Sequence, residues 1–83
     1  MSKRPRYSVH ALQRLGERGI LRRWVDAATQ TRPTCYGRRA VFVLSAEQLT
    51  QQFGDTFSQG LRVVMDTIRR VVVTAYWLVG SGE

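Results

Sequence analysis

The stretch that decides the fold of this chain is the pair of strand-forming segments near its end, Gly60-Leu61-Arg62-Val63-Val64-Met65-Asp66-Thr67-Ile68-Arg69-Arg70-Val71-Val72-Val73-Thr74-Ala75-Tyr76-Trp77-Leu78. Residues 61–65 and 71–78 are rich in β-branched and aromatic side chains, which predicts two strands, and the polar segment 66–70 predicts a hairpin connection. Because side chains alternate along a strand, we expect the odd-numbered residues of 71–78 on one face and the even-numbered residues on the other. Thr74 and Tyr76 are therefore expected to point the same way.

Two more strand-prone segments precede this hairpin, Cys35-Tyr36 and residues 40–44. Gly37-Arg38-Arg39 separates them and is typical of a tight turn or a bulge. After them, Ser45-Ala46-Glu47-Gln48 resembles a helix-capping box, and Leu49 and Phe53 form an apolar pair four residues apart. Residues 45–59 are therefore predicted to form a short surface helix or an ordered loop inserted between strands.

Helical spacing appears only in the first part of the chain. A first helix is predicted after the N-cap Ser8, with an apolar stripe from Val9, a weakening at Gly16 and an end at Gly19. A second helix is predicted from about Leu21 to Thr29, before Arg32-Pro33 stops it. Neither helix is long enough to be stable unless it docks on a sheet.

This order of elements predicts one α+β domain, residues 8–79, in a chain of 83 residues. Two amino-terminal helices are expected to pack on a three- to four-stranded antiparallel β-meander and to cover one of its faces. The other face is left to water or substrate. Residues 1–7 are predicted to be a flexible basic arm, and residues 80–83 a flexible tail.

Charge is distributed unevenly along the chain. The formal net charge is +7, and residues 1–39 carry ten basic and two acidic side chains, whereas residues 40–83 carry three basic and four acidic ones. The first half is therefore the expected electrostatic footprint for a polyanion. The alternative is that a basic composition only keeps a small protein soluble.

Cysteine and histidine content restricts the compartment and the chemistry. Cys35 is the only cysteine, so no intrachain disulfide can form; a reducing cytoplasm fits best, and the thiol is expected to pack. One cysteine and one histidine cannot build a closed zinc site, and we predict no metal and no cofactor. The apolar runs are too short to span a bilayer, so we expect a cytoplasmic protein without a membrane partner.

A titratable side chain and two arginines share one face of the first predicted helix. His10, Arg14 and Arg18 follow at steps of four, which aligns them along the helix. Imidazole is the side chain best suited to move protons near neutral pH, and guanidinium groups bind phosphate bidentately. This pattern suits an RNA-cleaving or RNA-binding surface. The alternative is a solvated helix face on which His10 has no chemical role.

Basic and hydroxyl side chains from the strands could complete such a surface. Arg62 is set in a strand pattern, and Arg38 and Arg39 lie beside another strand, where a sheet can aim them at a common phosphate. Thr74 and Tyr76 could orient a phosphate and a base. The alternative for Arg62 is a charge on an edge strand that discourages aggregation. The alternative for Thr74 and Tyr76 is that they are ordinary strand-forming residues. Trp24 and Trp77 are expected in the core.

Four segments of the chain resemble a family of small bacterial domains of unknown function that is grouped with RelE-like and BrnT-like toxins: His10-Ala11-Leu12-Gln13-Arg14, Glu17-Arg18-Gly19-Ile20, Gly60-Leu61-Arg62-Val63-Val64 and Val72-Val73-Thr74-Ala75-Tyr76-Trp77. The resemblance covers most of residues 7–77. It implies the architecture shared by barnase, EndoU, colicin ribonucleases and RelE, in which two helices precede a four-stranded antiparallel sheet. Residues 45–59 depart from that minimal meander.

The resemblance also implies a function. Carried over position by position, the site residues are His10, Arg14, Arg62, Thr74 and Tyr76 in a metal-independent endoribonuclease, the toxin of a toxin–antitoxin pair. Arg18, Arg38 and Arg39 are predicted to bind RNA beside them. The expected partners are RNA, including ribosome-bound mRNA or tRNA, and an antitoxin protein. The alternatives are an RNA-binding or ribosome-associated module without catalysis, and a small protein-interaction subunit.

Overall fold

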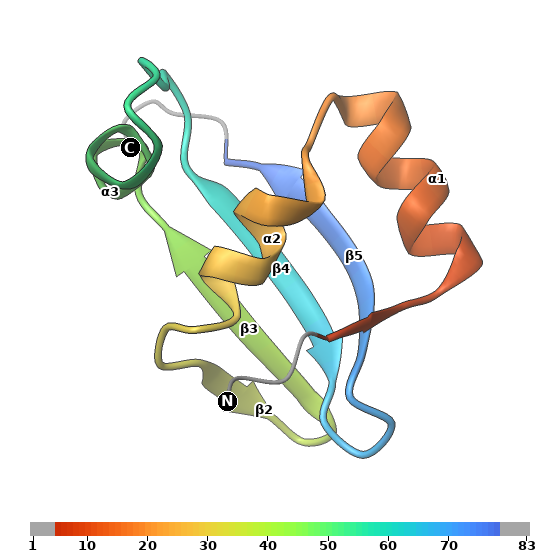
Figure 1. The fold of residues 1–83 in the computed structure, drawn as a ribbon. Helices are drawn as coiled ribbons and strands as arrows, with labels where there is room; N and C mark the ends of the chain where they lie inside the picture. Colours follow the sequence, from red (N-terminus) through yellow and green to blue (C-terminus); the bar gives the residue numbers. More distant parts are fainter. Residues whose placement is uncertain (1–4, 79–83) are drawn as a thin grey trace.

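A five-stranded mixed sheet and three helices make up the fold of residues 5–78, the part of the chain that the computed structural model describes. The spatial order of the strands is β1-β5-β4-β3-β2 (Figure 1). Their bounds are β1 (Arg6–Tyr7), β2 (Thr34–Tyr36), β3 (Arg39–Leu44), β4 (Leu61–Asp66) and β5 (Val71–Trp77). The helices are α1 (Val9–Arg18), α2 (Arg22–Ala28) and α3 (Ala46–Phe53).

The predicted α+β class is confirmed, but the purely antiparallel sheet and the arrangement with the helices first are not. Strands β2 to β5 form the antiparallel meander, whereas β1 precedes α1 and pairs with β5 in parallel. The Tyr7 hydroxyl donates to Asp26 Oδ1 over 2.6 Å, and the Arg6 N–H donates to the Arg70 carbonyl over 3.3 Å. A strand of two residues exists only through such tertiary contacts, so Arg6 and Tyr7 belong to the sheet and not to an arm. The predictions for residues 1–4 and 79–83 lie outside the described residues.

The ends of α1 and α3 follow local capping rules. Ser8 caps α1 by accepting a hydrogen bond from the Ala11 N–H over 3.0 Å, and Gly19 ends that helix in the left-handed conformation with φ 66°. The predicted capping box is confirmed at α3, where the Ser45 hydroxyl accepts from the Gln48 N–H and the Gln48 side chain accepts from the Ser45 N–H. Of the two predicted forms of the inserted segment, the structure shows a short helix.

A β-bulge in β5 overturns part of the predicted alternation of side chains. Val64 pairs with Thr74, but the next residue of β4, Met65, pairs with Val72, so Val73 is an extra residue in the ladder. Val72 therefore lies on the same face as Ala75, and both are fully buried. The prediction that Thr74 and Tyr76 share a face is confirmed, because both lie beyond the bulge.

The core lies between the sheet and the helices. Helices α1 and α2 cover one sheet face, α1 along β5 and α2 across β3 and β4 (Figure 1). The fully buried side chains include Ala11, Val25, Leu49, Leu61 and Val63. Trp24 and Trp77 pack against this core and against each other with ring centroids 5.6 Å apart, as predicted. Cys35, predicted to pack, is exposed because β2 is the outer strand of the sheet.

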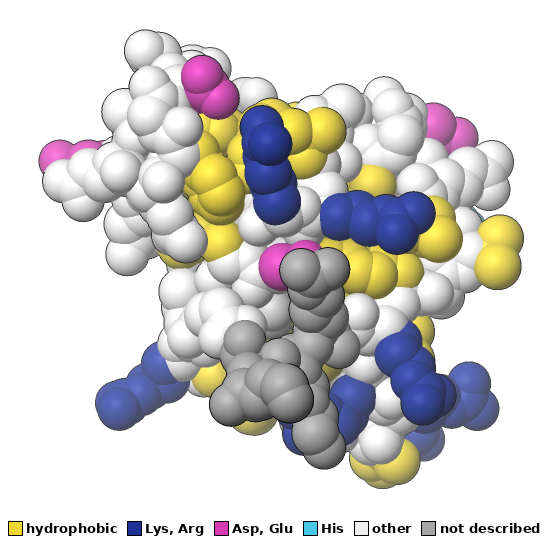
Figure 2. All heavy atoms as spheres, viewed as in Figure 1, with side chains coloured by type: hydrophobic (Ala, Val, Ile, Leu, Met, Phe, Trp, Pro, Cys, Tyr) yellow, Lys and Arg dark blue, Asp and Glu magenta, His cyan; other side chains and the backbone are white. Residues whose placement is uncertain are grey.

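Two further features of the described residues bear on function. Arginine side chains gather at one end of the helix-covered face, over β1 and the β4–β5 turn, at the lower right of Figure 2. In residues 5–78, no helix has the length and the apolar character needed to cross a membrane.

Candidate functional site

The candidate site is built on the sheet face that the helices leave uncovered. Residues paired directly across antiparallel strands point to the same face, and Arg62 pairs with Val43 on one side and with Tyr76 on the other. Their neighbours along the strands, Phe42 and Val63, point the opposite way into the core. Arg62, Tyr76 and Val43 therefore lie side by side on the open face, where Val43 is 46% exposed.

Two guanidinium groups flank the ring of Tyr76. The Arg62 Cζ atom lies 5.8 Å from the ring centroid, and the Arg18 Cζ atom lies 6.0 Å from it. Arg62 comes from β4 and Arg18 from the last turn of α1, so only the fold brings them to one ring. We call these three residues, Arg18, Tyr76 and Arg62, the arginine–tyrosine surface.

Arg18 reaches this surface because α1 lies along the edge of β5. Strand β1 covers that edge only at residues 71 and 72, and beyond it the Arg18 Nη1 atom donates to the Ala75 carbonyl over 2.8 Å. The same atom contacts Thr74 Oγ1 at 3.3 Å, and Trp77 Nε1 donates to the Arg18 carbonyl over 2.9 Å. The contacts at Nη1 hold the guanidinium in place and leave its other N–H donors for a ligand.

Arg62 has no carboxylate partner in the part of the chain that the structure describes. The ion pairs found within residues 5–78 join Arg14 to Glu17 and Arg38 to Asp66. The Arg62 Nε atom is buried and lacks a hydrogen-bond partner among these residues. An unpartnered buried donor on a cation is costly.

His10 and Arg14 form a separate pair on α1. The Arg14 Nε atom donates to His10 Nε2 over 3.4 Å, and the Arg14 Nη1 atom lies 3.1 Å from Glu17 Oε1. His10 is exposed. Eight residues separate His10 from Arg18, which is about 12 Å along a helix axis. A phosphate held between Arg18 and Arg62 is therefore out of reach of the imidazole, whereas a phosphate at Arg14 is beside it.

Arg38 and Arg39 lie at the far end of the sheet from Arg62. Arg39 pairs with Asp66 in the ladder. Arg62 precedes Asp66 by four residues in β4, which separates these two positions by about 13 Å at the usual rise of a strand. The Arg38 Nη2 atom lies 3.7 Å from Asp66 Oδ2. The backbone N–H of Arg69 holds the pKa of Asp66 below its ordinary value, and the Ile68 N–H and the charges of Arg38 and Arg69 add to this effect against the desolvation of the carboxylate.

The predicted site residues thus fall into three groups. Arg62, Thr74 and Tyr76 come together with Arg18. His10 and Arg14 form a separate pair nearer the start of α1. Arg38 and Arg39 lie apart from both groups. Arg18 was predicted only to bind RNA beside the catalytic residues, yet its side chain is the one on α1 that hydrogen-bonds to β5 in the described residues. Arg18 lies next to Gly19, where α1 ends against β5. The sequence marks the end of the helix there, but only the packing of α1 shows that this position brings the Arg18 side chain to the sheet. Among residues 5–78, no three His, Cys, Asp or Glu side chains cluster closely enough to hold a metal ion.

Comparison of the chain with protein-family models, with curated proteins and with solved structures finds no match. The resemblance to RelE-like and BrnT-like toxins therefore stays a prediction.

Proposed function

We propose that this protein binds single-stranded RNA on the open face of its sheet. One observation carries the proposal: a partly exposed tyrosine ring lies within 6.0 Å of two guanidinium groups that have no carboxylate partner in the described residues. Proteins that bind single strands combine aromatic rings, on which bases stack, with cationic groups that follow the phosphates. The arginine–tyrosine surface offers an aromatic ring and two cationic groups side by side.

Neighbouring side chains extend this surface in two directions. Arg14, whose charge is partly offset by its ion pair with Glu17, lies on α1 one helical turn from Arg18. Thr74 lies beside the ring, and its hydroxyl accepts from Arg18, so its own proton is available to an acceptor on the ligand. A ribose 2′-hydroxyl is such an acceptor, which favours RNA over DNA as the ligand.

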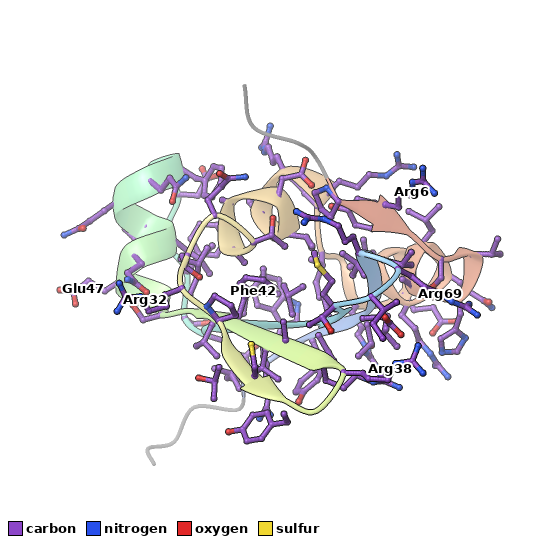
Figure 3. All side chains as sticks on the ribbon, turned by 90° about the horizontal axis from the view of Figure 1, so that it is seen from below. Arg6, Arg32, Arg38, Phe42, Glu47 and Arg69 are labelled. Carbon is purple, nitrogen blue, oxygen red and sulfur yellow. The ribbon has the colours of Figure 1, made fainter. Side chains whose placement is uncertain are left out.

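The binding proposal is tested with a fluorescently labelled single-stranded RNA of twelve nucleotides and measurement of its anisotropy. Arg62→Gln removes a charged donor from the surface, and the loss of a charge-assisted contact of about 1.5–3 kcal/mol weakens binding by about 10- to 150-fold. Arg32→Gln is the matched control, because Arg32 is an exposed arginine on the α2–β2 connection (Figure 3) and is not one of the arginines found at the Tyr76 ring. An equal loss in both variants, or no binding by the wild-type protein, would refute the proposal.

A second candidate function, metal-independent RNA cleavage, is favoured by the contact between His10 and Arg14. That contact places the His10 imidazole, the side chain best suited to general acid–base catalysis, beside a guanidinium that can bind a phosphate. The imidazole would take the proton of a 2′-hydroxyl, whose oxygen attacks the adjacent phosphorus while the bond to the 5′-oxygen breaks and that oxygen takes a proton from water. Arg14 would bind the reacting phosphate, and the arginine–tyrosine surface would hold nucleotides further along the strand. The products are a 2′,3′-cyclic phosphate and a 5′-hydroxyl end.

In this second candidate, the protein acts as the toxin of a toxin–antitoxin pair, with ribosome-bound mRNA or tRNA as substrate. Incubation of the purified protein with RNA in the presence of EDTA tests the chemistry. We expect cleavage by the wild-type protein and at least a hundredfold loss in His10→Ala, the usual contribution of a general base. RNA that stays intact at a protein concentration that saturates binding would leave binding alone as the function. Full activity in His10→Ala would refute the role of the imidazole.

A further inference from the structure

A pocket of 380 Å³ opens at the other end of the molecule from the arginine–tyrosine surface. Three arginines line it, Arg6, Arg69 and Arg70, together with the side chains of Phe42 and Met65. Phe42 and Met65 belong to the helix-covered face of β3 and β4, so this pocket and the open sheet face lie on opposite sides of the sheet. In Figure 3, Phe42 lies in the space between α2 and the sheet, and Arg6 and Arg69 lie to one side of it.

Tertiary structure places the three arginines together. The Arg6 N–H donates to the Arg70 carbonyl over 3.3 Å, so the strand β1 holds Arg6 beside the β4–β5 turn. Asp66 Oδ1 accepts from the Ile68 and Arg69 N–H groups over 2.9 and 3.0 Å, which fixes the turn itself. Arginines that come from a strand and from a turn 63 residues further along the chain meet only through this pairing.

The positive charge of this pocket is not neutralised by ion pairs within residues 5–78. The Asp66 carboxylate is the acidic group at the turn; it pairs with Arg38 over 3.7 Å, and its charge also acts on Arg69. No ion pair in the described part of the chain joins a carboxylate to Arg6 or Arg70. The pocket thus offers more guanidinium groups than its surroundings neutralise.

The backbone of Arg70 supplies an independent observation. Its φ is 58°, and within residues 5–78 it is the non-glycine residue with a positive φ. A side chain with a Cβ is unfavourable in this conformation, which a glycine adopts freely. Strained residues of this kind concentrate at ligand-binding sites, where the side chain is needed in spite of its backbone.

We propose that this pocket binds the phosphate and base of a nucleotide, either a free mononucleotide or the phosphorylated end of a strand. Three arginines that line one hollow offer enough N–H donors and positive charge for the several oxygens and the double charge of a terminal phosphate. Phe42 and Met65 supply the apolar wall against which a base lies. The volume falls within the range of small-molecule sites. This site does not depend on the RNA-binding role proposed for the open face.

Isothermal titration of the full chain with adenosine 5′-monophosphate, adenosine and inorganic phosphate tests the proposal. We expect the nucleotide to bind at least about tenfold more tightly than either of its parts, because only the nucleotide contacts both the arginines and the apolar wall. A six-nucleotide RNA with and without a 5′-phosphate distinguishes the two sources of the ligand, since tighter binding of the phosphorylated strand assigns the pocket to a strand end. Absence of nucleotide binding overturns the proposal, and so does equal binding of a glutamate-rich peptide.

Arg70→Gly is the most informative variant. It removes one guanidinium and relieves the strained backbone, so we expect nucleotide affinity to fall about tenfold while the melting temperature stays unchanged or rises. Arg69→Gln should weaken binding similarly, and Arg32→Gln should not. Unchanged affinity in Arg70→Gly and Arg69→Gln overturns the proposal. Loss of nucleotide binding in Arg62→Gln instead would place the ligand on the open face and would also overturn it, whereas retained binding in that variant separates this site from the RNA surface.

Discussion

Replacement of Tyr76 by leucine separates base stacking from charge in the proposed RNA interface. Tyr76→Leu removes the ring between Arg18 and Arg62 but leaves both guanidinium groups. A base stacked on an aromatic side chain contributes about 1–3 kcal/mol, so we expect the dissociation constant to rise about 5- to 150-fold. The number of phosphates bound does not change. The slope of log K against log salt concentration should therefore equal that of the wild-type protein.

Arg62→Gln should show the complementary behaviour. Loss of one phosphate contact on a single strand makes the salt slope shallower by about 0.7. Anisotropy titrations of the two variants and the wild-type protein between low and moderate salt measure both quantities. They must be run well below the melting temperature, because the loss of two cation–π contacts costs Tyr76→Leu roughly 1–2 kcal/mol of folding stability. An unchanged affinity in Tyr76→Leu, or a slope as shallow as that of Arg62→Gln, would refute a stacking role for the ring.

Three further predictions concern stability. Gly60→Ala should lower the free energy of unfolding by about 1–3 kcal/mol in urea titrations, because the added Cβ would lie 2.9 Å from the Leu44 carbonyl oxygen. Gly16→Ala is its control: a Cβ there meets nothing within 4 Å, so the free energy of unfolding should rise by about 0.5–1 kcal/mol. Tyr7→Phe should cost about 1.5–3 kcal/mol by breaking the 2.6 Å hydrogen bond to Asp26; an unchanged urea midpoint would show that β1 does not depend on it. Because the pKa of Asp66 is lowered in the folded state, its contribution is present above its unfolded pKa of about 4 and is lost as the pH falls through the folded value. The stability difference between wild type and Asp66→Asn should therefore shrink on acidification, and a difference that is constant with pH would contradict this.

Local rules in the sequence predict the meander and the helix caps. The hairpin of β4 and β5, the capping box at Ser45 and the helix stop at Gly19 each depend on residues close together in the chain, and the structure confirms all three. The bulge at Val73 could not be predicted, because a run of valines is equally compatible with either face of a sheet. The packing of α1 and α2 decides that Val72 is buried.

The candidate site follows the same division. The composition of the first half of the chain determined that a basic surface exists, and the spacing of His10, Arg14 and Arg18 determined that they line one helix face. Tertiary structure alone decided that Arg18, and not His10, reaches the sheet, because α1 ends against the part of the β5 edge that β1 leaves uncovered. It also placed Arg6 next to Arg70. Strand pairing acts between residues that are far apart in the chain, and no local pattern encodes which edge remains open for a strand of two residues to join.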